Sequence, residues 1–308
     1  MIINKHLFAA YCGMIKSGYD LADLSDEIVA NVYNWIKGTE FNEEILEYFR
    51  FTRTDTVPVN PYYPRGSDLS VACFYQHKSL EEYVGFLHLC ESPEADNPVF
   101  IKWVSQLPVI LTQIENYEGF SSQYQNYCEA LKKRFADVSG HMKDIEETMK
   151  NPPFCTKASV EFAPNLLQSK CLADYALVDD TLYVISGFFR KSAVIHEYLH
   201  LALKPVRGLL VDIVQRYGIE KYVDVKCMLE LGYLRGDSIE DKAHTLDECI
   251  VRTLCGLLDN TLDVQEYCRE NVQYGFHSVS WMMGNLSGCK LYDHSLYDII
   301  LMMTKIKE

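Results

Sequence analysis

The stretch TLYVISGFFRKSAVIHEYLH, residues 181–200, contains the change of pattern around which the fold is organised. Its first six residues, Thr181–Ser186, are mostly β-branched or aromatic and precede Gly187, which is typical of a short strand. After Gly187 the apolar spacing becomes helical and continues through His200, and Pro205 ends the helix. The stretch therefore predicts a strand that is followed directly by a helix.

Segments on both sides extend this pattern into an α+β fold. Ala158–Phe162 and Asp174–Val178 are further strand candidates, and the tight connection Asp179-Asp180 predicts a hairpin with Thr181–Ser186. An isolated strand is expected at Leu69–Gln76 (LSVACFYQ). We expect a mostly helical α+β protein with a small mixed sheet before the 188–200 helix. Helical spacing covers residues 1–50, 79–90, 105–150, 208–217, 238–258, 261–271 and 291–306.

A proline-rich stretch interrupts the helical pattern early in the chain. Residues Thr56–Asp68 form the best candidate for a linker or a long surface loop. We expect a helical N-terminal portion at residues 1–104, whose role the sequence does not reveal, and a second domain at residues 105–308.

The composition excludes several classes of function. Lys and Arg number 29 against 43 Asp and Glu, so the net charge is −14. A chain this acidic repels phosphate backbones and anionic lipid headgroups, and we expect neither nucleic-acid nor membrane binding.

The 11 cysteines are an odd number, scattered without a CxxC pair, which favours reduced thiols over a disulfide framework. With no signal peptide evident, the expected location is the cytoplasm.

The segment His196-Glu197-Tyr198-Leu199-His200 fits the pattern H-E-x-x-H. On a helix, positions four apart share one face, so both imidazoles can bind one Zn²⁺ ion. Glu197 directly follows His196, where its carboxylate reaches a water activated by the metal. It is therefore the candidate catalytic base, and it can pass the proton on to a leaving amine.

A third zinc ligand is expected from another helix, because LALKPVRG after His200 adds none. The best candidate is Glu248, beside an apolar helical stripe, with Arg252 one turn later to orient its carboxylate. A capping box formed by Thr245 and Glu248 and a plain Glu248–Arg252 surface pair are the alternative interpretations. His244 and Asp247 compete with Glu248 as ligands, and Glu230 is a weaker competitor.

HEYLH followed at a distance by a helical DECIVR resembles the gluzincin group of zinc metallopeptidases. It is especially similar to bacterial gluzincin-like proteins of unassigned function in which a Glu-x-x-x-Arg helix follows the zinc helix. The resemblance covers about residues 155–260 and implies a zincin-like domain that binds one Zn²⁺ per chain through His196, His200 and Glu248. It also implies that Glu197 is the base and acid, and that the strand Thr181–Ser186 borders the cleft and pairs with an extended peptide or protein substrate.

One departure from the group is the long gap between His200 and Glu248, where we expect residues 206–240 to form helices or a loop over the site. A tetrahedral oxyanion usually receives a further donor besides the metal. The candidates for this donor are Tyr222, Tyr233, His277 and Tyr274.

Other functions stay open at this point. A zinc amidase similar to deformylases would use Cys171, Cys227 or Cys249 as third ligand, although the EGCLS-type stretch expected before the motif is absent. A non-catalytic zincin-fold binding protein would hold zinc without hydrolysis. A helical scaffold with an accidental motif would hold no metal. The sequence leaves the oligomeric state undetermined.

Overall fold

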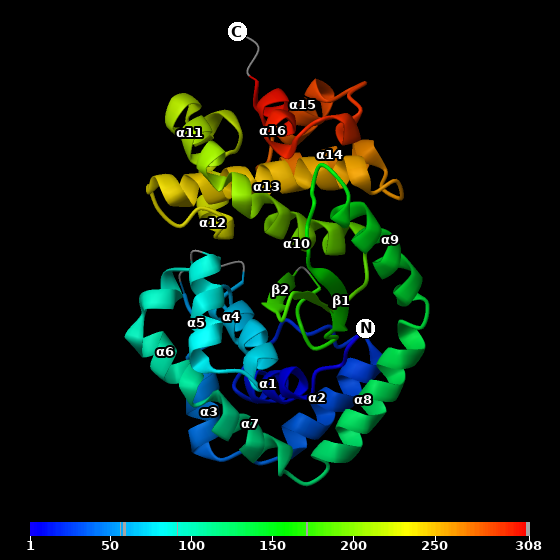
Figure 1. The fold of residues 1–308 in the computed structure, drawn as a ribbon. Helices are drawn as coiled ribbons and strands as arrows, with labels where there is room; N and C mark the ends of the chain where they lie inside the picture. The colour runs from blue at the N-terminus through cyan, green and yellow to red at the C-terminus, as the bar shows by residue number, and fades with distance from the viewer. Residues whose placement is uncertain (56, 58–59, 91, 171, 306–308) are drawn as a thin grey trace. The chain divides into compact units, whose positions relative to one another are not determined.

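The computed structural model describes residues 1–55, 57, 60–90, 92–170 and 172–305 (Figure 1). The chain forms two compact units, and neither is continuous in sequence. Unit 1 comprises Met1–Asp55, Pro61–Met142 and Ser159–Phe189, and unit 2 comprises Thr56–Asn60, Lys143–Ala158 and Arg190–Glu308. The expected boundary after residue 104 stays a prediction, as does the role of residues 1–104. Thr56, Pro58 and Val59 of the expected loop lie outside the described residues.

Unit 1 is built around the helix α1 (Lys5–Lys16). Every residue from Leu7 to Ile15 is buried, so this helix is enclosed on all sides rather than amphipathic. It packs against α2, α3 and α7. The remaining helices of unit 1 are α2 (Glu27–Gly38), α3 (Glu43–Arg50), α4 (Arg65–Ala72), α5 (Leu80–Leu89), α6 (Pro98–Ser105), α7 (Leu107–Glu115) and α8 (Phe120–Arg134), with short 3₁₀ turns at Cys73–Tyr75 and Pro93–Asp96.

The sheet of unit 1 has three strands in the order β1-β3-β2. β1 (Ser159–Pro164) is parallel to β3 (Thr181–Ser186), and β2 (Ala173–Val178) is antiparallel to it. The predicted hairpin and the small mixed sheet are therefore confirmed. Asp179 and Asp180 make the turn with φ of 49° and 58°, a left-handed conformation that Asp tolerates better than most residues.

Two expectations about strands are wrong. Leu69–Gln76 is not a strand, because α4 and a 3₁₀ turn occupy it. Its apolar residues are buried on several sides of the helix, so the periodicity that would have identified a helix is lost. The expected pairing of Thr181–Ser186 with a substrate is also excluded, because β3 is the central strand and its backbone already pairs with β1 and β2.

Unit 2 is organised by α13 (Ile239–Leu258), which packs against α10, α11 and α15. The predicted helix at 238–258 is confirmed, and so is the one at 208–217. The sequence predicted helices or a loop at residues 206–240, and the structure has α11, α12 and their connecting segments there. The elements of unit 2 are α10 (Lys191–Leu203), α11 (Arg207–Tyr217), α12 (Val225–Leu231), α13, α14 (Val264–Gln273), α15 (Val279–Asn285) and α16 (Leu296–Thr304), with 3₁₀ turns at Lys204–Val206, Ile219–Lys221 and Leu291–Asp293. The helix α9 (Val138–Lys150) begins in unit 1, and its residues from Lys143 belong to unit 2.

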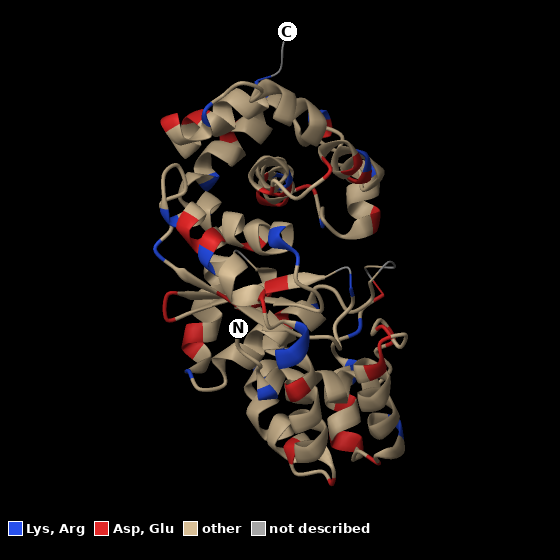
Figure 2. Ribbon diagram, turned by 90° about the vertical axis from the view of Figure 1, so that its right-hand side faces the viewer, with Lys and Arg blue, Asp and Glu red and all other residues tan. Residues whose placement is uncertain are grey.

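The acidic residues and the cysteines are distributed as the composition predicts. Asp and Glu residues are spread over the helices of both units (Figure 2). Each cysteine in the described ranges is a free thiol. No described helix combines the length and the apolar character that crossing a bilayer requires.

Candidate metal centre

The H-E-x-x-H segment lies on α10, inside unit 2. Tyr198 and Leu199 face the core and are fully buried, and the Tyr198 hydroxyl donates a hydrogen bond to the carbonyl of Ala158. This anchoring leaves His196 and His200, one turn apart, on the helix face that meets α13. Their rings lie 4.9 Å apart between centroids and at 77° to each other, so the two Nε2 atoms converge.

The helix α13 supplies the third group. Ser238 caps its first turn by accepting a hydrogen bond from the amide of Asp241. Thr245 therefore lies in mid-helix, where its hydroxyl donates to the carbonyl of Asp241 at 3.0 Å. The capping-box interpretation of Thr245 and Glu248 is wrong, because no helix begins there. Glu248 is 7% exposed and is no surface residue either.

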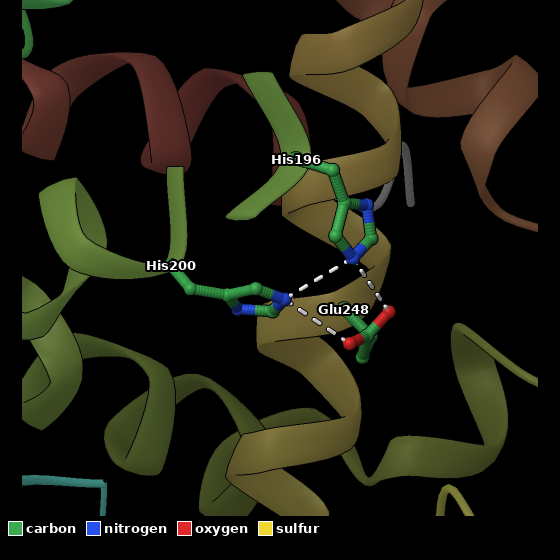
Figure 3. Close-up of side chains that lie close together, drawn as sticks. All are labelled: His196, His200 and Glu248. Carbon is green, nitrogen blue, oxygen red and sulfur yellow. Dashed lines mark hydrogen bonds and ion pairs between the residues drawn. The ribbon is translucent and has the colours of Figure 1, made fainter. Parts of the chain in front are cut away.

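His196, His200 and Glu248 meet at one point (Figure 3). The two Nε2 atoms are 3.2 Å apart. Glu248 Oε1 lies 3.2 Å from Nε2 of His200, and Oε2 lies 3.6 Å from Nε2 of His196. Zinc bonds of about 2.0–2.1 Å in a tetrahedral arrangement place ligand atoms roughly 3.3 Å apart. The two separations of 3.2 Å are close to this value, and the three side chains lie near enough to hold one metal ion.

Asp247, a competitor for the third ligand, lies on the other side of His200. Its Oδ2 is 2.5 Å from Nδ1 of His200. A metal-binding histidine usually donates its second N–H to such an acceptor, which fixes the tautomer and directs the remaining lone pair at the metal. Sequence reasoning missed this role for Asp247, and the only signal was its position next to Glu248.

The other competitors are placed differently. His244 lies close enough to feel the charges of Asp247 and Glu248, and burial lowers the pKa of its imidazole. It is not part of the group of converging ligand atoms. Glu230 has a side chain that is 65% exposed and pairs with Lys226 on α12, so it is not a ligand in this arrangement.

Arg252 contacts Glu248 as the sequence suggests. Its Nε lies 3.4 Å from Glu248 Oε2, one helical turn away. The guanidinium also donates to Asn271 at 3.2 Å and to the Tyr233 hydroxyl at 2.9 Å, and it stacks 4.1 Å from the ring of Phe276. The contacts of Asn271 and Phe276 with Arg252 could not be predicted, because neither residue lies in a recognisable sequence motif.

Burial and charge shift the titration of the three groups. Burial lowers the pKa of His196. Burial also acts to lower the pKa of His200, but the carboxylates of Asp247 and Glu248 outweigh it and hold this pKa well above its ordinary value. For Glu248, burial acts to raise the pKa, and the two imidazoles bring it well below the usual range.

The charges of the cluster suit a divalent cation. Asp247 and Glu248 are 8% and 7% exposed, and Arg252, with a side chain that is 17% exposed, pairs with Glu248. With neutral imidazoles, these two carboxylates and one guanidinium leave one net negative charge. Buried charge of this size needs compensation. Glu248 Oε2 makes no hydrogen bond, and its neighbours are Arg252 Nε at 3.4 Å and His196 Nε2 at 3.6 Å.

The other sequence candidates do not converge on this cluster, apart from Tyr233 through Arg252. The Tyr222 hydroxyl donates to the carbonyl of Thr304, and Tyr222 is fully buried. His277 is exposed and contacts the carbonyl of Lys221, and Tyr274 is 52% exposed. Burial raises the pKa of the Cys249 thiol to about 12, which disfavours a thiolate ligand. Cys227 and Cys249 are outside the ligand group, and Cys171 lies outside the described residues.

Comparisons with known proteins identify no relative. No protein-family model matches the chain, and no curated protein and no solved structure matches it.

Proposed function

We propose that the protein is a zinc-dependent hydrolase of peptide bonds, with a zincin-like site of the gluzincin type in unit 2. The observation that carries the proposal is the convergence of His196, His200 and Glu248 at spacings of 3.2–3.6 Å, with Glu197 on the same helix turn. Residues between these ligands, Tyr198 and Leu199, are core residues that fix the helix. The free thiols fit a reducing compartment, and we place the protein in the cytoplasm.

The ligand set favours zinc over metals that prefer octahedral sites. Two imidazole nitrogens and one carboxylate oxygen are usual for catalytic zinc. Metals that prefer octahedral sites are usually held by carboxylate, carbonyl and water oxygens instead.

Each side chain then has a separate task. When bound, Zn²⁺ lowers the pKa of a water to about 7 and polarises a carbonyl oxygen. His196, His200 and Glu248 hold the ion, and Asp247 keeps Nδ1 of His200 protonated so that Nε2 faces it. Glu197 takes the proton from the attacking water and delivers it to the departing amide nitrogen. Glu197 is 7% exposed and therefore lies inside unit 2.

Metal content of the purified protein tests this proposal. We expect about one zinc per chain, sharply reduced by Glu248→Ala and retained by His244→Ala, because only Glu248 belongs to the ligand group. The zinc-loaded protein is then offered a peptide library, with cleavage read by mass spectrometry. Absence of stoichiometric metal in protein purified without chelators would refute the proposal. Zinc without cleavage of any peptide would favour a zinc-dependent binding protein instead.

A further inference from the structure

The guanidinium of Arg252 is held in place by groups other than Glu248. Nη1 donates to Asn271 Oδ1 at 3.2 Å and Nη2 donates to the Tyr233 hydroxyl at 2.9 Å. The Phe276 ring covers one face at 4.1 Å. Asn271 is itself fixed, because its amide donates to the carbonyl of Tyr267 at 2.8 Å. The guanidinium of Arg252 therefore does not depend on Glu248 for its position.

The two carboxylate oxygens of Glu248 have different surroundings. Oε1 lies 3.2 Å from Nε2 of His200. Oε2 lies farther from the imidazoles, 3.6 Å from Nε2 of His196, and has Nε of Arg252 at 3.4 Å. A fixed guanidinium attracts the nearer oxygen electrostatically and disfavours a second cation beside it.

We propose that Arg252 is a positioning residue that retains Oε2 of Glu248, so that the carboxylate binds the metal through Oε1 alone. This inference rests on the metal site proposed above. Catalytic zinc keeps a position open beside its three protein ligands. A carboxylate that bound through both oxygens would occupy that position, so Arg252 keeps it accessible to water and to a substrate carbonyl.

Cobalt substitution measures this property without any substrate. Co²⁺ replaces Zn²⁺ in such sites, and its visible absorption is strong in four-coordinate sites and weak in sites of higher coordination. The variants are Arg252→Met, which removes the charge at similar length, and Arg252→Lys, which retains it. Arg269→Met on α14 is the matched control, because Arg269 is exposed in the same unit. Circular dichroism and thermal unfolding verify that each variant folds.

We expect Arg252→Met to bind Co²⁺ at the parent stoichiometry with a severalfold weaker visible band, because both oxygens of Glu248 then bind. Arg252→Lys should restore part of the intensity, and Arg269→Met should match the parent. If Arg252→Met does not fold, Asn271→Ala loosens the guanidinium and should weaken the band in the same direction. An unchanged band in a folded variant with normal cobalt content would overturn the inference while leaving the proposed metal site intact. Failure of the parent protein to bind Co²⁺ or Zn²⁺ would instead overturn the proposed function.

Discussion

Oδ2 of Asp247 lies 2.5 Å from Nδ1 of His200, while Nε2 on the opposite side of that ring faces His196 and Glu248. Asp247 and Glu248 are adjacent in sequence, yet one carboxylate orients a ligand and the other is a ligand. Both are on α13, and the helical rotation of about 100° between neighbours places them on different sides of the imidazole.

Asp247→Asn should weaken zinc binding about 10- to 100-fold without unfolding the protein. The amide keeps the shape but loses the charge that stabilises the protonated Nδ1. Competition with a chromophoric chelator measures the affinity. Asp241→Asn, on the half-buried first turn of the same helix and outside the ligand group, is the control and should bind zinc like the parent. Equal affinities for the two variants would exclude the orienting role.

Glu197→Gln should retain stoichiometric zinc and lose peptide hydrolysis by about 10²- to 10⁴-fold. Glu197 is not among the ligand atoms that converge with His196 and His200, so its replacement removes a base and not a ligand. His196→Ala should lose both zinc and activity. Metal analysis beside turnover of a cleaved library peptide distinguishes the two effects, and a fully active Glu197→Gln would disprove the assigned mechanism.

We expect Asp174 to make unit 1 less stable at neutral pH, because its carboxyl is buried. Burial raises the pKa of its carboxyl to about 6, and the hydrogen bond that Gln168 donates to it only partly opposes this. The folded-state pKa lies above the unfolded one, so the protonated carboxyl favours folding in acid, and this contribution is lost as the pH rises through about 6. Asp174→Asn should therefore raise the free energy of unfolding at pH 8 by on the order of 2 kcal/mol and by much less at pH 4.

Urea unfolding of parent and variant at both pH values measures this difference. Asp137→Asn in the same unit is the control, because Asp137 is exposed. A gain for Asp174→Asn that does not depend on pH would show that ionisation of this carboxyl is not its origin.

Gly13 allows α1 to approach α3 closely. A Cβ at this position would collide with the ring of Phe49, which is buried. Gly13→Ala should destabilise the protein by about 1–3 kcal/mol, as overpacking of a core does. Gly85→Ala in α5 is the matched helical control, because no atom would lie within 4 Å of its Cβ, and it should be neutral or slightly stabilising. Thermal unfolding compares the two, and equal melting temperatures would contradict the packing at Gly13.

Local patterns in the sequence predicted a substantial part of the structure. The spacing of His196 and His200, the hairpin at Asp179-Asp180 and the helix around Glu248 depend on residues a few positions apart, so the sequence alone was sufficient for them. The pattern failed at Leu69–Gln76, because a helix buried on several sides shows no apolar period.

Relations between distant segments required the tertiary structure. That β3 is the central strand depends on which strands pair, and this excluded substrate pairing along Thr181–Ser186. The choice of Glu248 over His244 as the third group, and the fixing of Arg252 by Asn271, depend on how α10, α13 and α14 pack. The sequence by itself determined the candidate ligands on α10 and their helical spacing. Only the tertiary structure decided their partners, because contacts between helices arise from packing across the core and leave no period in the chain.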